Sequence, residues 1–68
     1  MNEIIFVVEE ALEGGYVARA LGLSIFTEAD DEKELHANIR EAIQAYFDDG
    51  KAPKVICLHY VREERISA

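Results

Sequence analysis

The chain has 68 residues, 50% hydrophobic and 31% charged, a balance typical of one small globular domain spanning residues 1–68. Seven basic and fourteen acidic residues give a net charge of -7, which disfavours a module that grips nucleic-acid phosphates. The single cysteine, Cys57, excludes an internal disulfide framework, and no apolar run approaches the roughly 20 residues of a membrane span. The N-terminus lacks the pattern of a signal peptide, so we expect a cytoplasmic protein without membrane contacts.

Three short segments at the start of the chain have the pattern of β-strands. Residues 4–8 are β-branched or aromatic and apolar on both faces, which predicts a strand in the centre of a sheet. Gly14-Gly15 is a turn signal, because paired glycines adopt positive φ without steric cost. Residues 16–21 and 23–28 give a second and a third strand. The spacing predicts an antiparallel meander.

A helix follows the three predicted strands. Asp31 is the expected N-cap, and Glu34 three residues later completes a capping box. We expect the helix to end near Phe47 or Asp48, with Gly50 as the stop signal. A stripe of apolar residues at helical spacing is predicted to face the sheet, namely Leu35, Ile39, Ala42, Ile43 and Tyr46.

Residues 54–61 predict a fourth strand, again apolar on both faces and therefore expected, like residues 4–8, in the middle of the sheet. Residues 62–68 form a polar tail. The order β-β-β-α-β predicts an α+β fold with the helix on one sheet face. Because one helix covers only one face, and so short a chain buries a small core, we expect self-association into a homodimer or higher oligomer.

No set of residues has the pattern of a catalytic or metal site. Cys57 and His59 share one strand face, and His36 is a third candidate ligand, but structural zinc takes four nitrogen or sulfur ligands. Cys57 and His59 are also about 7 Å apart along the strand, too far for an activated nucleophile. We therefore expect no metal, no cofactor and no enzyme activity.

The acidic residues do not suggest a nuclease. A two-metal nuclease needs several carboxylates that converge on the sheet, whereas residues 4–8 contain none. Asp30 and Asp31 are explained as caps of the helix, and Asp48 and Asp49 as a solvated helix end. Gly14-Gly15 has no following helix and no Lys-Ser/Thr, so it is not a phosphate-binding loop.

Three short motifs resemble the N-terminal domain of the HicB antitoxin family: Gly15-Tyr16-Val17-Ala18, Thr27-Glu28-Ala29-Asp30-Asp31, and Asn38-Ile39-Arg40-Glu41-Ala42-Ile43. The resemblance covers residues 4–47 and extends to the strand after them. It implies a partial RNase H-like fold without nuclease activity, and a partner similar to the HicA toxin, a small basic mRNA interferase. Many family members carry a further DNA-binding domain, for which these 68 residues have no room, so we expect a stand-alone form without direct nucleic-acid binding.

Two classes of function follow. The first is a non-catalytic, antitoxin-like binding module, because a protein of charge -7 is attracted to a basic RNA-cleaving partner. The second is an oligomeric accessory domain, or a small-ligand-binding domain, without a toxin partner. For the first class, the predicted partner-binding residues are exposed acids: Glu28, Asp30, Glu32, Glu41, Glu63 and Glu64. Singly, each of them also fits a solubilising charge.

Overall fold

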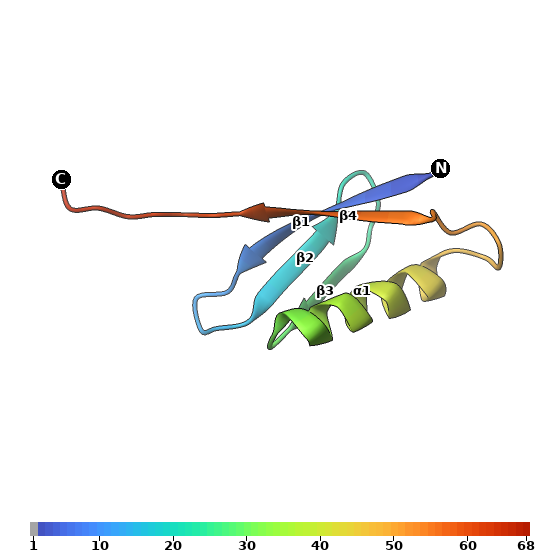
Figure 1. The fold of residues 1–68 in the computed structure, drawn as a ribbon, viewed down its shortest axis with the longest axis horizontal. Coiled ribbons are helices and arrows are strands. Elements are labelled where there is room, and N and C mark those ends of the chain that lie inside the picture. Colours follow the sequence, from blue (N-terminus) through green and yellow to red (C-terminus); the bar gives the residue numbers. More distant parts are fainter. Residues whose placement is uncertain (1) are drawn as a thin grey trace.

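The computed structural model describes residues 2–68, which form a four-stranded sheet with one helix on one of its faces (Figure 1). The predicted α+β class and the order β-β-β-α-β are confirmed. The elements are β1 (Glu3–Glu10), β2 (Tyr16–Ala20), β3 (Phe26–Ala29), α1 (Glu32–Tyr46) and β4 (Val55–Val61).

The sheet has the strand order β3-β2-β1-β4. The first three strands form the predicted antiparallel meander, with Phe6 opposite Ala20 and Ala18 opposite Thr27. β4 lies on the other side of β1 and runs parallel to it, with Phe6 opposite Leu58. The expectation that residues 54–61 lie in the middle of the sheet was wrong, because β4 is an edge strand. On its helix-facing side, Ile56 and Leu58 are half-buried, whereas Val55, His59 and Val61 on the other side are exposed.

The hydrophobic core lies between α1 and the helix-facing side of the sheet. Every second residue of β1 points into it, because side chains alternate along a strand, and Phe6 at its centre is 0% exposed. Leu35, Ile39 and Ile43 of α1 pack against these side chains, as predicted. The other buried apolar residues are Ile4, Val8, Ala18, Ala20, Ile25 and Ala29.

The predicted apolar stripe of the helix fails at its last position. Tyr46 is 48% exposed, and Phe47 packs against the core instead. The reason is that α1 ends at Tyr46, and Phe47 adopts an extended backbone conformation that takes it out of the helical spacing. Gly50 does not end the helix; it has a φ of 76° in the turn that Lys51 N–H closes onto Asp48 C=O.

The start of the helix matches the prediction in its main contact. Asp31 is the N-cap, and its Oδ1 accepts the backbone N–H of Glu34 at 2.8 Å. The return contact of the capping box differs, because Glu34 Oε1 accepts the N–H of Asp30 at 3.4 Å and not that of Asp31.

Several strand boundaries also differ from the predicted ones, by one or two residues at most ends and by three at the start of β3. β2 ends at Ala20, one residue early, and β3 begins at Phe26 and not at Leu23. Ala20 N–H donates to Ile25 C=O at 3.0 Å, which closes residues 20–25 into a turn. Ile25 is buried in this turn, so the apolar pattern of residues 23–25 reports burial and not a paired strand.

The second face of the sheet has no helix over it. Ile5, Val7 and Val17 are half-buried there by their neighbours, while Phe26 is 64% exposed. This confirms that the helix covers one face only.

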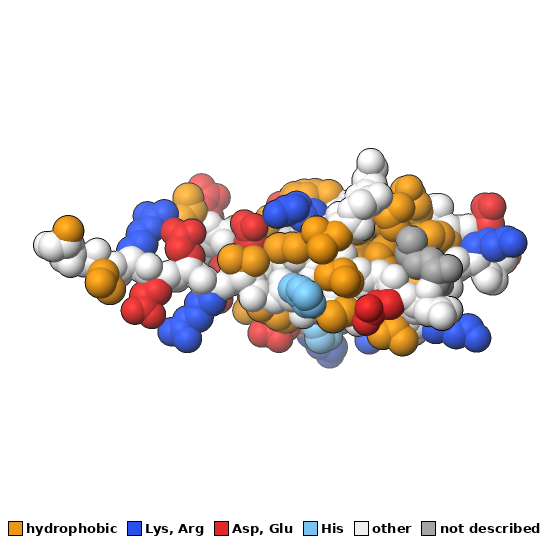
Figure 2. Space-filling model, turned by 90° about the horizontal axis from the view of Figure 1, so that it is seen from above, with side chains coloured by type: hydrophobic (Ala, Val, Ile, Leu, Met, Phe, Trp, Pro, Cys, Tyr) orange, Lys and Arg blue, Asp and Glu red, His pale blue; other side chains and the backbone are white. Residues whose placement is uncertain are grey.

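The residues after Val61 extend away from the body of the molecule, as Figure 1 shows. The radius of gyration is therefore 13.3 Å, above the roughly 11 Å of a compact chain of this length. Figure 2 shows hydrophobic side chains gathered over the body and charges of both signs along the projecting tail.

Candidate partner-binding surface

Eight carboxylates gather at one end of the sheet, a region we call the acidic pole. The directions of the strands and of the helix explain this clustering. β1 and β3 both end at this pole, β2 begins there, and only two residues separate β3 from the start of α1. The register places Glu9 and Glu28 on either side of Val17. The carboxylates of the acidic pole are Glu9, Glu10, Glu13, Glu28, Asp30, Asp31, Glu32 and Glu34.

The backbone of the pole is held by contacts between α1 and the end of β3. Asn38 Nδ2 donates to the carbonyl of Glu28 at 3.0 Å, and so ties the second turn of the helix to the strand. Asp31 and Glu34 are engaged in capping the helix. Glu9 lies 3.9 Å from Arg19, an exposed pair that contributes little to stability and leaves the pole acidic.

Two tyrosines join the acidic pole to β4. The rings of Tyr16 and Tyr60 meet edge to face, with centroids 6.2 Å apart, and Tyr16 Oη donates to Glu32 Oε1 at 3.4 Å. Burial and then the carboxylates of Glu32 and Glu10 raise the pKa of Tyr16. Burial and then Glu32 raise the pKa of Tyr60. Both phenols therefore remain neutral donors beside the acids.

The structure brings together only some of the acids predicted to bind a partner. Glu28, Asp30 and Glu32 are exposed neighbours at the acidic pole. Glu63 and Glu64 lie on the tail, which leaves the body at the same end because β4 runs parallel to β1. Glu41 is exposed on α1 but lies nine residues after Glu32, roughly 13 Å along the helix axis and away from the pole.

The acids of the tail have basic partners within the tail. Glu63 Oε1 accepts from Arg65 Nε at 2.9 Å, and Glu64 lies 3.8 Å from Arg62. All four side chains are mostly exposed, so these pairs are weak and exchangeable.

Sequence reasoning missed Glu9, Glu10 and Glu13 as members of the same surface. They are 15 or more residues from Glu28 in sequence, and only the antiparallel pairings of β1 with β2 and of β2 with β3 bring them to the same end of the sheet. The predicted meander contained this signal, because in an antiparallel meander the first and third strands end at the same end of the sheet.

A wide groove adjoins the acidic pole, between the β1–β2 loop and the tail. Its volume is about 880 Å³. Leu12 in its wall is 97% exposed, so the groove offers an apolar contact beside the charges. Its lining combines acids with two arginines of the tail: Glu9, Glu10, Ala11, Leu12, Tyr60, Val61, Arg62, Glu63 and Arg65.

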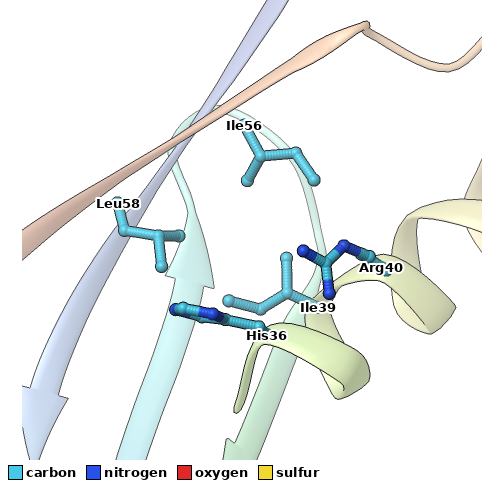
Figure 3. Close-up of a pocket in the computed structure, with 5 residues that line it drawn as sticks. All are labelled: His36, Ile39, Arg40, Ile56 and Leu58. Carbon is cyan, nitrogen blue, oxygen red and sulfur yellow. The ribbon is translucent and has the colours of Figure 1, made fainter. Parts of the chain in front are cut away.

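A second, smaller groove lies between α1 and β4 (Figure 3). It has a volume of about 220 Å³. Ile39, Ile56 and Leu58 form its apolar floor, and His36 and Arg40 on the helix stand beside it. It exists because α1 packs over β2 and β3 and leaves the helix-facing side of β4 half covered.

The described residues offer no cluster for a metal. Within residues 2–68, no three His, Cys, Asp or Glu side chains lie close enough to share a metal ion, and Cys57 is a free, half-buried thiol. In the same residues, no helix is long and apolar enough to cross a membrane. The expectation that the chain has no cofactor and no enzymatic activity stays a prediction.

Comparison with known proteins places the chain in a family. It is 46% identical to a UPF0150 protein of Archaeoglobus fulgidus over 55 residues, which are 81% of this chain and 82% of that protein. The chain belongs to the UPF0150 family. A second UPF0150 protein, from Thermotoga maritima, is 37% identical over 66 residues, which are 97% of this chain and 93% of that protein. No family model and no solved structure matches this UPF0150 chain.

Proposed function

We propose that this protein is a non-catalytic binding module similar to a HicB antitoxin, and that it neutralises a small, basic mRNA interferase by covering the surface that holds RNA. The observation that carries the proposal is the acidic pole, where eight of the fourteen acidic residues gather. An RNA-cleaving protein needs a basic surface to hold its substrate. A concentrated acidic surface attracts that region and competes there with RNA.

The surroundings of the acidic pole also suit protein binding. Tyr16 and Tyr60 supply rigid aromatic surface beside the charges, and Leu12 supplies an exposed apolar contact. The tail begins at the same end and carries Glu63 and Glu64. Charges of this kind set the association rate and the orientation, while the aromatic and apolar contacts supply the affinity.

The experiment uses the product of the adjacent reading frame. The two proteins are co-expressed and co-purified, and the partner's RNA cleavage is then measured with and without the present protein. We expect a complex, and loss of cleavage at an equimolar ratio. If the neighbour's product is not bound, or if its cleavage of RNA continues in the complex, the antitoxin proposal is wrong.

Paired charge reversals test whether the acidic pole is the surface involved. Glu28→Lys with Asp30→Lys changes the net charge from -7 to -3, because each of the two substitutions adds two units. The matched control is Asp48→Lys with Asp49→Lys, two exposed acids after the opposite end of α1 with the same change in charge. We expect slower association, by about tenfold or more, for the first pair only. Equal effects of both pairs would mean that net charge and not the pole governs capture.

We also propose that the chain self-associates, and this is the basis of the second candidate function, an oligomeric accessory domain that holds a small ligand. The observation that favours self-association is the uncovered apolar surface, which includes Phe26 at 64% and Val55 at 53% exposure. If no toxin partner is found and the protein is an oligomer, the accessory-domain function becomes the better account.

A further inference from the structure

The two edges of the sheet are not equally protected against pairing with another strand. At one edge, β3 has only four residues and carries Glu28 on its exposed side. Short, charged edge strands discourage pairing. At the other edge, β4 has seven residues, Val-Ile-Cys-Leu-His-Tyr-Val, without a carboxylate, lysine, arginine, proline or glycine. Nothing in the sequence of β4 discourages the addition of a strand.

The backbone of β4 is ready to pair. Val55 N–H donates to Asn2 C=O, so Val55 and every second residue after it direct their backbone groups to β1. The N–H and C=O groups of Ile56, Leu58 and Tyr60 therefore point outward. Within residues 2–68, no strand lies on that side.

We propose that β4 pairs antiparallel with β4 of a second copy of this chain, about a two-fold axis at Leu58, to give a continuous eight-stranded sheet. This proposal deepens the self-association proposed above and is independent of the toxin partner. A two-fold axis perpendicular to the sheet places both helices on the same face.

The register follows from the outward backbone groups and from the side chains. In an antiparallel pair of strands, only residues whose backbone N–H and C=O groups point outward form the hydrogen-bonded pairs. In β4 these residues are Ile56, Leu58 and Tyr60, so the two copies must form their hydrogen bonds through them. Centring on Leu58 places apolar residues opposite each other at every pair except that of Cys57 with His59. Val55 then lies opposite Val61, Ile56 opposite Tyr60, and Cys57 opposite His59 of the second copy.

Exposure and charge favour a second copy as the occupant. Val55, Tyr60 and Val61 are about half exposed, at 53%, 48% and 50%, and each gains an apolar neighbour in this register. Two chains of charge -7 repel each other, and β4 is the edge strand without a carboxylate, so repulsion is least there. Beyond the strand, this register brings Arg62 near Lys54 of the second copy, which are like charges. Their repulsion is reduced because Glu64 of the same chain lies 3.8 Å from Arg62.

Pairing at this edge also changes the groove between α1 and β4. Tyr60 of the second copy comes beside Ile56, at the mouth of the groove that Ile39, Ile56 and Leu58 line. The two grooves then lie on the same face of the eight-stranded sheet, one on each side of the axis.

Disulfide trapping tests the proposal in the full-length protein. Cys57 and His59 of opposite copies form a non-hydrogen-bonded pair with Cα atoms about 4.5 Å apart, within the roughly 4.4 to 6.8 Å that a disulfide spans. Within one chain the same positions are about 7 Å apart, too far to bond. After mild oxidation of the His59→Cys variant, we expect most of the protein to run as a disulfide-linked dimer on a non-reducing gel.

Two matched controls keep the test specific. The Val55→Cys variant also has two thiols, but the introduced thiol lies about 13 Å along the strand from Cys57 of the second copy. The His59→Cys variant with Cys57→Ser keeps the introduced thiol and removes its partner. We expect both controls to remain unlinked, and sedimentation of the natural protein at micromolar concentration to show a dimer or a larger assembly of dimers.

The outcomes separate the proposals. A 7.7 kDa monomer in sedimentation would overturn both self-association and the β4 pairing. An oligomer in which the His59→Cys variant does not link would overturn the β4 pairing alone. Equal linking in the Val55→Cys control would show random collision and would also overturn it. None of these results depends on the toxin partner.

Discussion

At the scale of single residues, Gly15 is the position at which the fold allows least freedom. It lies before β2 with a φ of +82°, and a Cβ atom there would stand 2.6 Å from the carbonyl oxygen of Ala29. Gly14 beside it also has a positive φ, of +98°, but open space around it. A substitution at Gly14 therefore introduces conformational strain alone, whereas a substitution at Gly15 adds a steric clash.

We predict that Gly15→Ala is more destabilising than Gly14→Ala. Both substitutions place a Cβ atom in the left-handed region, which costs roughly 1 to 2 kcal/mol. Gly15→Ala adds the contact with the Ala29 carbonyl, whose backbone must move. Urea unfolding of the two variants measures the difference. Equal losses would show that the end of β3 shifts freely.

The tyrosines at the acidic pole predict a pH effect. Burial and the carboxylates of Glu32 and Glu10 raise the pKa of Tyr16 in the folded state above its ordinary value of 10.0. The neutral phenol is therefore favoured by folding, and its contribution is complete below pH 10 and lost as the pH rises through the folded pKa. We expect stability to fall above about pH 10, and to fall less steeply in the Tyr16→Phe variant. Denaturant unfolding at a series of alkaline pH values measures this. An unchanged alkaline slope in the variant would contradict it.

At the scale of elements, α1 shows how far periodicity predicts packing. The spacing of Leu35, Ile39 and Ile43 placed them correctly in the core, because helical geometry puts such residues on one stripe. Periodicity failed at Tyr46, because the helix ends there and the direction of the chain after a helix is decided by tertiary contacts. Phe47, at the predicted end of the helix, packs against the core instead.

We predict that Ile39→Ala destabilises the fold by about 2 to 5 kcal/mol, because Ile39 is 1% exposed between α1 and the sheet. Tyr46→Ala, at a half-exposed position of the same helix, should cost less than about 1.5 kcal/mol, mainly its edge-to-face contact with Phe47. Chemical denaturation of both variants gives the comparison. A loss under about 0.5 kcal/mol for Ile39→Ala would mean that the stripe does not carry the core.

At the scale of the whole molecule, the acidic charge is unevenly distributed. It concentrates at one end of the sheet, while the β4 edge is free of carboxylates and the tail carries charges of both signs. The two proposed interfaces are therefore stabilised by different kinds of interaction. Long-range attraction brings a basic partner to the acidic pole, and backbone hydrogen bonds with apolar contacts join two copies at β4.

The tail gives the prediction that belongs to this scale. If it lies across the basic partner, Glu63→Lys with Glu64→Lys should slow association several-fold at low salt. The difference from the natural protein should shrink at high salt, because charges screen one another over about 8 Å at physiological ionic strength. Stopped-flow association at several salt concentrations measures both effects. An association rate equal to that of the natural protein at low salt would place the tail outside the interface.

Local sequence patterns predicted the class of fold and most of its elements. Alternation, paired glycines and a capping signal are local features, so they predicted the meander, the helix start at Asp31 and the fourth strand to within a few residues. The excess of carboxylates was likewise visible as composition.

Contacts between distant parts of the chain set where these features lie relative to one another. Strand order is set by long-range pairing, so local pattern could not show that β4 is an edge, nor that Glu9, Glu10 and Glu13 join Glu28 and Asp30 at one pole. Such contacts also decided that Glu41 lies apart from them and that Phe47 replaces Tyr46 in the core. The physical reason is the same in each case: periodicity fixes which face of an element is apolar, whereas packing between distant elements fixes what that face meets.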